Sequence, residues 1–249
     1  MTFWLILLAV ALILTLFFVK LVKGAKKYNH IDWGSPFLNF IDGLSRYYCI
    51  RFHKLDFERF SLPAEGGAIL ISNHISGLDP LLLIAASNRP IRFMIATEEY
   101  NRFGLKWLFK GAGCIPVNRS GRADIAFRQA RRALEEGEIV ALFPHGKIHL
   151  DHEEPFRVKP GIKKLAELTK YSIFVCRIVG VRGQGSVFTA LLLRSQSKII
   201  QFPTINHHYF NHSESLHHLG EVLLGHRNPF AKDGDTKQGV IKSSTSNRL

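Results

Sequence analysis

The chain has 249 residues, with 33 lysines and arginines against 20 aspartates and glutamates, which gives a formal net charge of +13. Its length suits one sizeable α/β domain with additions at its ends, and its charge predicts an anionic partner, either nucleic acid or anionic lipid. Three cysteines, Cys49, Cys114 and Cys176, lie far apart without a C-x-x-C pair. This pattern argues against a disulfide framework and favours a reducing compartment.

The first nineteen residues separate the two kinds of partner, because "MTFWLILLAVALILTLFFV" contains no charged side chain. A helix of this length rises about 28 Å, close to the roughly 30 Å hydrocarbon core of a bilayer. Basic residues follow the run and none precede it: Lys20, Lys23, Lys26 and Lys27. A soluble core helix would have a polar face, and a signal peptide would begin with basic residues and end in a small-residue cleavage site. We therefore predict a single membrane-anchoring helix at residues 1–22, with the remainder on the cytoplasmic side, an anionic lipid surface as partner and no nucleic acid.

A second helix is expected to begin at Ser35-Pro36, because serine suits the N-cap and proline the first helical position. Its apolar face is rich in aromatic side chains: Phe37, Phe40, Ile41, Leu44 and Tyr48. Two interpretations are open, a helix packed on the domain and an amphipathic helix in the headgroup region, and both can hold together. We assign residues 23–60 to a basic linker and this amphipathic interfacial helix.

From about residue 66, short apolar runs alternate with helix-like stretches, which predicts an α/β fold with a largely parallel central sheet flanked by helices. The expected strands are "GAILIS", "IRFMIA", "CIPV", "EIVALF" and "SIFVCRIVGV", followed by "SVFTALLLR" and "KIIQF". The expected helices are Leu81–Ser87, Glu98–Phe109, Ala123–Glu136, ended by Gly137, and Gly161–Thr169. We assign residues 61–225 to this domain and residues 226–249 to a polar tail that is expected to be mobile.

The segment "NHISGLDP", residues 73–80, directly follows the first expected strand. In open α/β sheets, functional groups gather at the carboxyl ends of strands. The five-residue spacing of His74 and Asp79 does not suit one face of a helix, whereas a turn around Gly77 can bring the carboxylate onto the imidazole ring. A carboxylate on one ring nitrogen leaves the other nitrogen to accept a proton, which suits general-base catalysis near neutral pH. We therefore predict a catalytic pair.

Simpler interpretations of these residues remain open. Asp79 stands directly before Pro80 and an apolar run, as an N-cap does, and Ser76 with Asp79 matches a capping-box pattern. His74 can equally be a histidine that is only hydrogen-bonded. The capping and catalytic roles of Asp79 do not exclude each other.

At this point the chain resembles the glycerolipid acyltransferases of the 1-acylglycerol-3-phosphate acyltransferase type, whose first block is N-H-x-x-x-x-D. "GAGCIPVNRSGR", residues 111–122, looks like the second block of that family, and "LFPHGK", residues 142–147, resembles the third. "VCRIVGV", residues 175–181, loosely resembles the fourth. The resemblance covers roughly residues 65–185, and three ordered blocks after a membrane anchor make it specific.

The resemblance implies transfer of an acyl group from an acyl thioester to the hydroxyl of a lysophospholipid, chiefly 1-acylglycerol-3-phosphate, giving phosphatidic acid. His74 would take the hydroxyl proton, and Asp79 would orient the ring and stabilise the imidazolium. The expected partners are the lysophospholipid and the thioester, carried on coenzyme A or acyl carrier protein. Acyl-CoA or acyl-ACP serves as co-substrate and no cofactor is expected.

An acceptor phosphate needs fixed donors, and the matched blocks supply them. Arg119 can grip phosphate oxygens in a bidentate fork, Lys147 adds charge, and Gly146 lets backbone N–H groups approach an anion. The alternative is that Arg119 is a solvated surface arginine. We also assign Asn73 and Arg122 to substrate binding.

His145 departs from the family pattern, which usually has glutamate there. A neutral imidazole cannot replace a carboxylate, although a protonated one can bind phosphate, so we include His145 among the substrate-binding residues. The departure leaves two alternatives: an acyltransferase for a different lysophospholipid, as in the tafazzin-like branch, or a catalytically weak lipid-binding relative.

A metal-dependent hydrolase is a third alternative, because His145, His149 and His152 have spacings that face one way on a helix. Pro144 and Gly146 disfavour a helix there, so we assign no metal site. A nucleophilic serine is not indicated, since the chain contains no G-x-S-x-G elbow.

Overall fold

The computed structural model describes residues 2–60, 62–119, 121, 123–150, 153 and 157–226. The expected polar tail lies outside the described residues from position 227 onward, so its mobility stays a prediction. The domain boundaries of the preceding section also stay predictions.

A six-stranded sheet with the order β3-β2-β4-β1-β5-β6 forms the centre of the domain. Five strands are parallel, and β6 runs antiparallel to β5 at one edge. The strands are β1 (Ala68–Ser72), β2 (Ile91–Ala96), β3 (Ile115–Val117), β4 (Ile139–Leu142), β5 (Ile173–Val179) and β6 (Lys198–Ile205). The α/β fold with a mostly parallel sheet is therefore confirmed. β1 lies between β4 and β5, so the chain that leaves its end emerges at the middle of the sheet.

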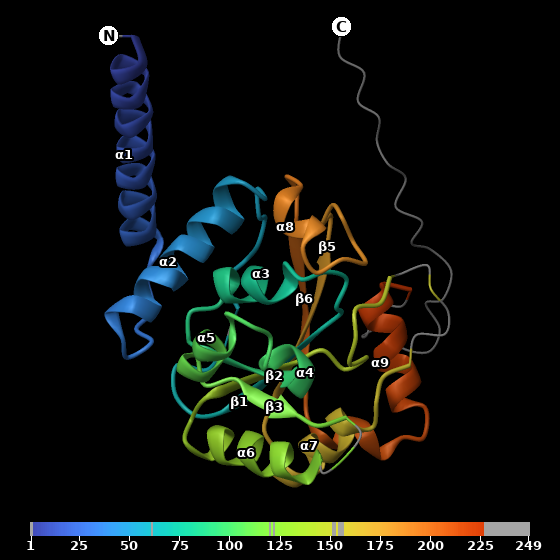
Figure 1. Ribbon diagram of the computed structural model, residues 1–249. Helices are drawn as coiled ribbons and strands as arrows, with labels where there is room; N and C mark the ends of the chain where they lie inside the picture. The colour runs from blue at the N-terminus through green and yellow to red at the C-terminus, as the bar shows by residue number, and fades with distance from the viewer. Residues whose placement is uncertain are drawn as a thin grey trace, which may run out of the picture.

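The helices cover both faces of this sheet and extend beyond it (Figure 1). In chain order they are α1 (Thr2–Tyr28), α2 (Pro36–Arg51), α3 (Asp79–Ala86), α4 (Thr97–Tyr100), α5 (Lys106–Gly111), α6 (Ala123–Glu135), α7 (Gly161–Thr169), α8 (Thr189–Leu192), the 3-10 helix η1 (His207–Asn211) and α9 (Ser215–Leu224). The sequence analysis did not anticipate η1 or α9.

Two local predictions were wrong. The helix expected over Glu98–Phe109 is divided into α4 and α5 by a turn at Gly104, whose φ of +79° suits glycine. The run "SVFTALLLR" forms the short helix α8 in place of a strand. The Ser186 hydroxyl accepts hydrogen bonds from the backbone N–H groups of Phe188 and Thr189, which starts the helical turn.

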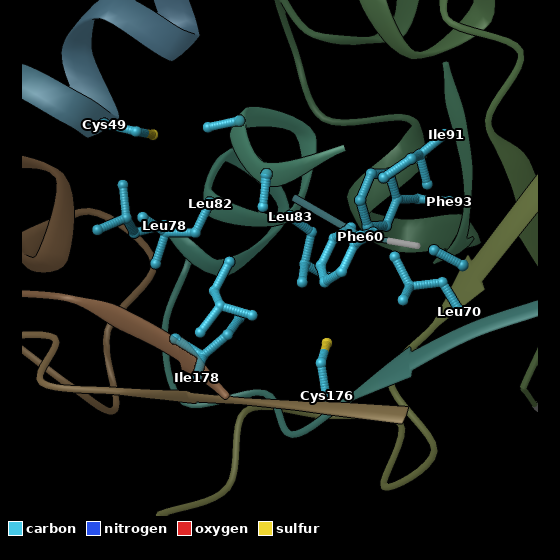
Figure 2. Close-up of a cluster of buried hydrophobic side chains, with 14 of the residues drawn as sticks. Cys49, Phe60, Leu70, Leu78, Leu82, Leu83, Ile91, Phe93, Cys176 and Ile178 are labelled. Carbon is cyan, nitrogen blue, oxygen red and sulfur yellow. The ribbon is translucent and has the colours of Figure 1, made fainter. Parts of the chain in front are cut away.

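Two hydrophobic clusters hold the helices on the sheet. Figure 2 shows the first, where Leu82 and Leu83 of α3 pack beside Leu70 of β1 and Ile178 of β5. The second lies on the opposite face, which Ile69 occupies because neighbouring strand residues point to opposite sides. It packs the sheet against α6, α7 and α9. The parallel strands are buried on both faces, which explains their continuous apolar sequences.

Helix α1 is long and apolar enough to cross a membrane, with a mean hydropathy of 2.9 over an 18-residue window of which none is buried. Only its last turns pack on the protein, where Gly24 and Ala25 are buried against α2. Gly43 of α2 makes this possible, since a Cβ there would collide with the Ala25 carbonyl oxygen. Figure 1 shows α1 projecting away from the domain beyond this contact.

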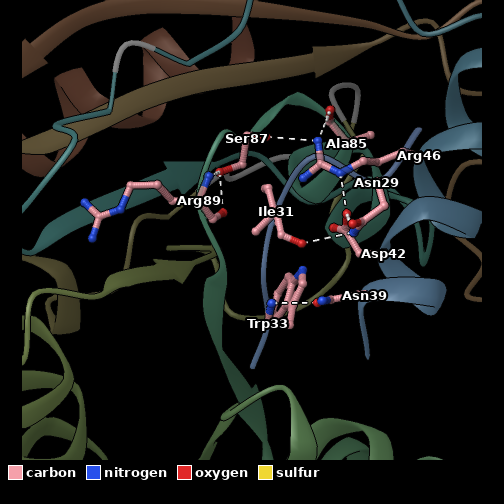
Figure 3. A network of polar contacts seen from close by, with 9 residues as sticks. All are labelled: Asn29, Ile31, Trp33, Asn39, Asp42, Arg46, Ala85, Ser87 and Arg89. Carbon is pink, nitrogen blue, oxygen red and sulfur yellow. Dashed lines mark hydrogen bonds and ion pairs between the residues drawn. The ribbon is translucent and has the colours of Figure 1, made fainter. Parts of the chain in front are cut away.

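Helix α2 begins at Pro36 as predicted, and it packs on the domain through a buried ion pair (Figure 3). The Arg46 Nε donates to Asp42 Oδ2 at 2.7 Å. The same guanidinium donates through Nη1 to the carbonyl oxygens of Ala85, at 2.9 Å, and Ser87, at 3.0 Å. These carbonyls lie at the C-terminal end of α3, so α2 is tied directly to that helix.

Candidate active site

The chain turns sharply between β1 and α3, and this turn carries the predicted catalytic pair. The Nδ1 atom of His74 lies 2.8 Å from Oδ2 of Asp79. Backbone hydrogen bonds fold the turn back, with Asp79 N donating to the Ser76 carbonyl oxygen at 3.4 Å. The structure thus brings the two side chains together at the carboxyl end of a central strand, the place where open α/β sheets collect functional groups.

The carboxylate of Asp79 is fully buried, and each of its oxygens has a partner. Besides His74, Oδ2 accepts from the backbone N–H of Ile75 at 2.6 Å and of Ser76 at 2.8 Å. Oδ1 accepts from the Ser76 hydroxyl at 2.7 Å. A buried carboxylate is costly unless it is hydrogen-bonded in this way, and the bonds also hold it in one orientation.

The N-cap interpretation of Asp79 is wrong, because Leu78 occupies that position and Asp79 is the first helical residue. Part of the capping-box pattern is nevertheless present. The Asp79 carboxylate accepts from the Ser76 backbone, and the Ser76 hydroxyl accepts from Leu78 N at 3.2 Å. The same carboxylate therefore stabilises the turn and orients the imidazole.

The His74 ring is held between this carboxylate and an aromatic side chain. Its plane stacks on Phe143, with ring centroids 4.1 Å apart and an interplanar angle of 12°. The side chain is 19% exposed, so the histidine is not sealed in the core. Because Nδ1 is used by Asp79, Nε2 is the nitrogen that can meet a substrate hydroxyl. An imidazole fixed in this way can act as a general base.

Asn73 has a structural role in place of the predicted substrate contact. It is buried, its Nδ2 donates to the Ile178 carbonyl oxygen at 2.9 Å, and its Oδ1 accepts from Ile178 N at 2.7 Å. Both polar ends of the amide therefore continue the pairing of β1 with β5 beyond Ser72. This fixes the position from which His74 leaves the sheet.

A cationic cavity of about 440 Å³ collects most of the predicted substrate-binding residues. Its lining is Arg119, His145, Gly146, Lys147, Arg157, Val158, Lys159 and Pro160. Four of these side chains carry a positive charge at neutral pH and none is acidic. Such a cavity suits a phosphate or another anion. Arg122, the remaining predicted member, lies outside the described residues.

Arg157 and Lys159 were missed in the sequence analysis. They come from the segment before α7, which folds back over the "FPHGK" turn through a hydrogen bond from Lys159 N to the Pro144 carbonyl oxygen at 2.9 Å. Gly146, with φ of +83°, leaves the space, since a Cβ there would lie 2.8 Å from Lys159 Nζ. The signal available in the sequence is the basic run "RVKP", which follows the third block closely.

His145 is buried in the wall of this cavity. Its Nδ1 lies 3.1 Å from the Arg157 carbonyl oxygen, and its ring centroid is 4.2 Å from that of His149. Burial lowers the pKa of His145, and the charges of His149, Lys147 and Lys159 lower it further, against the raising effect of its hydrogen bond to the Arg157 backbone. The imidazole is thus neutral at pH 7 and places no negative charge beside a bound anion.

The histidines do not form a metal site within the described part of the chain, where no three metal-binding side chains come together. His152, the third member of the proposed set, lies outside the described residues.

One tight turn connects the His74–Asp79 pair to the cationic cavity. Phe143 stacks on His74, and its carbonyl oxygen accepts from Gly146 N at 2.9 Å, which carries the chain into the cavity within three residues. A second link is the hydrogen bond from His149 N to the His74 carbonyl oxygen at 2.8 Å. The His74–Asp79 pair and the cationic cavity are therefore adjacent parts of one structure.

The chain is similar to known proteins in sequence and in fold. A family model described as "Acyltransferase" matches residues 54–179, just over half of the chain. A protein of Mycoplasma genitalium named "Probable 1-acyl-sn-glycerol-3-phosphate acyltransferase" is 30% identical over 122 residues, which cover 47% of this chain and 45% of that relative. The chain thus matches less than half the length of this relative.

A solved structure has the same fold. The 1-acyl-sn-glycerophosphate (LPA) acyltransferase PlsC from Thermotoga maritima aligns with a TM-score of 0.54 and 18% identity, over 75% of this chain and 78% of that one. The family match and the fold agree with each other. The chain belongs to the acyltransferase family.

Proposed function

We propose that this protein is a membrane-bound 1-acylglycerol-3-phosphate O-acyltransferase. It transfers a fatty acyl group from acyl-CoA or acyl-ACP to the free hydroxyl of 1-acylglycerol-3-phosphate, giving phosphatidic acid. The observation that carries the proposal is the turn from Phe143 to Gly146, whose first residue stacks on His74 and whose last residue lines the cationic cavity. A histidine base beside an anion site matches an acceptor that has a hydroxyl and a phosphate.

In the proposed reaction, His74 Nε2 takes the proton of the acceptor hydroxyl as that oxygen attacks the thioester carbonyl. The C–S bond then breaks, and the imidazolium returns the proton to the departing thiolate, so that a free thiol leaves. Asp79 keeps the ring oriented and stabilises its positive charge through the 2.8 Å contact with Nδ1. General-base assistance contributes about 10²–10⁴ in rate, and holding the two substrates together supplies much of the remainder.

The cationic cavity is proposed to hold the acceptor phosphate. Arg119, Lys147, Arg157 and Lys159 offer charge-assisted hydrogen bonds, and Gly146 leaves room for the Lys159 ammonium group. Because histidine, unlike glutamate, carries no negative charge, His145 does not repel a phosphate. The exchange of glutamate for histidine therefore changes the wall of the anion site and leaves the His74–Asp79 pair intact.

Helix α1 is proposed to anchor the protein in the membrane. Its apolar length and exposed surface suit a bilayer, and lysines cluster only at its C-terminal end, which by the positive-inside rule places the catalytic domain on the cytoplasmic side. The predicted partners follow from this placement: an anionic lipid surface, the lysophospholipid within it, and a soluble acyl thioester.

The acceptor is tested by a thiol-release assay with the full chain in vesicles and a panel of lysophospholipids. We expect lysophosphatidic acid to support the fastest release and lysophosphatidylcholine much slower release, because the cavity holds only cationic and neutral side chains. Parallel reactions with acyl-CoA and acyl-ACP identify the donor. Preference for a zwitterionic acceptor would favour the remodelling alternative, and tight lysolipid binding without thiol release would favour the catalytically weak relative.

The phosphate role is tested by Arg119→Ala and Arg157→Ala, with Arg128→Ala as the matched control. Arg128 is an exposed arginine of α6 that pairs only with Asp124 among the described residues. Loss of a charge-assisted hydrogen bond costs about 1.5–3 kcal/mol, so the acceptor KM should rise about 10- to 100-fold in each cavity variant. The control should leave it unchanged. An unchanged KM in both cavity variants contradicts the assignment.

A further inference from the structure

The turn between β1 and α3, residues 73–79, is called the catalytic turn here because it carries His74 and Asp79. The segment between β5 and β6, residues 180–197, is joined to it by backbone hydrogen bonds. Gly185 N donates to the Ile75 carbonyl oxygen at 2.9 Å, and Gly77 N donates to the Ser186 carbonyl oxygen at 3.1 Å. Contact is close enough that a Cβ on Gly77 would collide with the Val187 backbone. Because the two segments share these bonds, a displacement of one displaces the other.

The outer surface of this segment is strongly apolar. Phe188 is 61% exposed and Leu192 is 78% exposed, and Leu193 beside them is also exposed. Helix α8 lies among them and buries only Ala190. Large apolar side chains concentrated in so few exposed residues mark a contact surface. We call residues 186–194 the α8 loop.

The charges around the α8 loop indicate what it contacts. Arg182 precedes it and Arg194 is its last residue, both are exposed, and the segment 180–197 contains no acidic residue. The Arg102 guanidinium lies 5.4 Å from the centre of the Phe188 ring. Exposed aromatic and aliphatic side chains bordered by arginines suit the boundary between the acyl chains and the phosphates of an anionic bilayer.

The position of the α8 loop agrees with a bilayer as its partner. Figure 1 shows α8 at the end of the domain from which α1 projects, whereas α7 lies at the opposite end. The Tyr48 hydroxyl of α2 donates to the Leu191 carbonyl oxygen, which joins the loop to the helix that packs against α1. The apolar loop and the apolar helix therefore face the same side.

We propose that the α8 loop inserts into the headgroup region of an anionic bilayer and, through its bonds to Ile75 and Gly77, sets the depth of the catalytic turn at the lipid surface. Insertion itself rests on the exposed side chains and charges of the loop. The effect on depth rests on the proposed function, because it concerns how His74 meets a lipid hydroxyl.

Insertion is tested with the full chain carrying Leu192→Cys, labelled with an environment-sensitive fluorophore and reconstituted in vesicles of phosphatidylcholine and phosphatidylglycerol. The matched control is Leu168→Cys, which replaces another exposed leucine, on α7. Native cysteines should not compete for the label, since all three are buried, and burial raises the pKa of Cys114 to about 11 and of Cys176 to about 12. Because α1 is proposed to hold both variants on the vesicle, a difference in quenching between the two labels reports whether the α8 loop contacts the bilayer.

We expect the label at position 192 to be quenched several-fold more by nitroxide lipids than the label at position 168, and to be protected from aqueous iodide. Equal quenching at the two positions would overturn the proposal. Protection that appears in detergent without a bilayer and grows with protein concentration would also overturn it, because a second copy of the chain would then be covering the loop.

The effect on depth is tested with Leu192→Glu against Leu168→Glu. Thiol release with a vesicle-embedded acceptor should fall about tenfold in the first variant only, the scale expected for one leucine kept out of an apolar environment. Release with a short-chain, water-soluble acceptor should stay unchanged. An equal loss with both acceptors would refute the role in depth. Because the quenching measurement needs no turnover, insertion can be established even if the proposed reaction fails.

Discussion

A buried carboxylate lies near each end of α3, and the two are held in different ways. At the first end, Asp79 accepts hydrogen bonds from two backbone N–H groups, one hydroxyl and the His74 ring. At the other end, Asp42 of α2 pairs with Arg46, whose guanidinium also binds the Ala85 and Ser87 carbonyl oxygens. Within the described residues, Asp42 Oδ1 and Arg46 Nη2 have no hydrogen-bond partner.

The difference indicates that the His74–Asp79 pair is built for the proposed reaction and the Asp42–Arg46 pair for holding α2 on α3. Mostly neutral donors satisfy Asp79, and its one ionisable partner is a partly exposed histidine whose second ring nitrogen is left for a substrate. Asp42 depends on a permanently charged arginine that is sealed from water, so this pair cannot respond to a substrate. A buried ion pair contributes little net stability against apolar residues of similar size, but loss of one partner leaves an uncompensated charge. We expect catalysis to depend on the first end and folding on the second.

The largest expected effect is on activity at the first end. His74→Ala should lower kcat by about 10²–10⁴, because it removes the proposed general base. The thermal midpoint should change little, since the ring is partly exposed and makes one hydrogen bond. Thiol release measured beside thermal unfolding in detergent checks both statements. Near-normal turnover by a folded His74→Ala protein would rule out this base.

The next effect is on stability at the second end. Arg46→Ala should lower the free energy of unfolding by about 3–5 kcal/mol, because Asp42 is left buried without its positively charged partner and keeps only the hydrogen bond from Asn29 Nδ2. The double variant Arg46→Met with Asp42→Leu should recover most of this loss. Activity per folded molecule should stay within a few-fold of the parent in the double variant. A large loss of kcat there, at normal stability, would mean that the second end also serves the chemistry.

A buried histidine just beyond α2 sharpens the comparison, because His53 has no partner for either ring nitrogen within the described residues. Tyr48 and Phe52 enclose its ring, and burial lowers the pKa of His53 to about 4. Between pH 6.5 and pH 4 the unfolded chain therefore binds a proton that the folded chain does not. Stability is at its full value above pH 6.5 and falls as the pH drops, by about 1.4 kcal/mol per pH unit and about 3 kcal/mol in total.

Thermal midpoints of the parent and His53→Leu, measured across this pH range, test the assignment. The thermal midpoint of the parent should fall relative to that of His53→Leu as the pH drops from 6.5 to 4, because only the parent has the ionisable ring. If the thermal midpoints of the two proteins changed with pH in parallel, protonation of His53 would not be coupled to unfolding.

The smallest effect is expected at an exposed ion pair of the same i,i+4 spacing. The Arg131 Nε atom of α6 lies 2.7 Å from Glu135 Oε1, the same distance as between Arg46 Nε and Asp42 Oδ2 in the buried pair. Both side chains of the α6 pair are about half exposed. Arg131→Gln should change the free energy of unfolding by no more than about 0.5 kcal/mol, because water screens the charges. Chemical denaturation alongside Arg46→Ala provides the comparison. Similar losses in both variants would contradict the importance given to burial.

The strands, the parallel sheet and the His74–Asp79 contact could be predicted because each depends on a short stretch of sequence. Apolar runs mark strands buried on both faces, and a glycine-containing turn can fold a carboxylate back onto a nearby ring. The α8 loop could not be predicted in this way. Its apolar residues suit a strand, but β5, the strand that precedes it in the chain, already pairs with β1 on one side and β6 on the other and has no free side for it.

The parts of the site that were missed depend on distant contacts. Arg157 and Lys159 reach the cavity only because the chain folds back onto Pro144, and no local pattern specifies that. Asn73 looked like a substrate ligand, but its amide is used by Ile178, more than a hundred residues away. Arg46 and Asp42 resemble an ordinary surface pair in the sequence, and only the packing of α2 on α3 reveals their burial.

The close packing of Gly43 against Ala25 has a consequence for how the enzyme meets its substrate. Because backbone lies directly on backbone there, we expect the close packing of α1 on α2 to restrict how far α1 can turn relative to the domain. With α1 in a bilayer, as proposed, the catalytic turn would keep a nearly constant orientation relative to the membrane plane. Encounters with acceptor lipid would then be governed by lateral diffusion within one leaflet, a two-dimensional search in which only the thioester must arrive from solution.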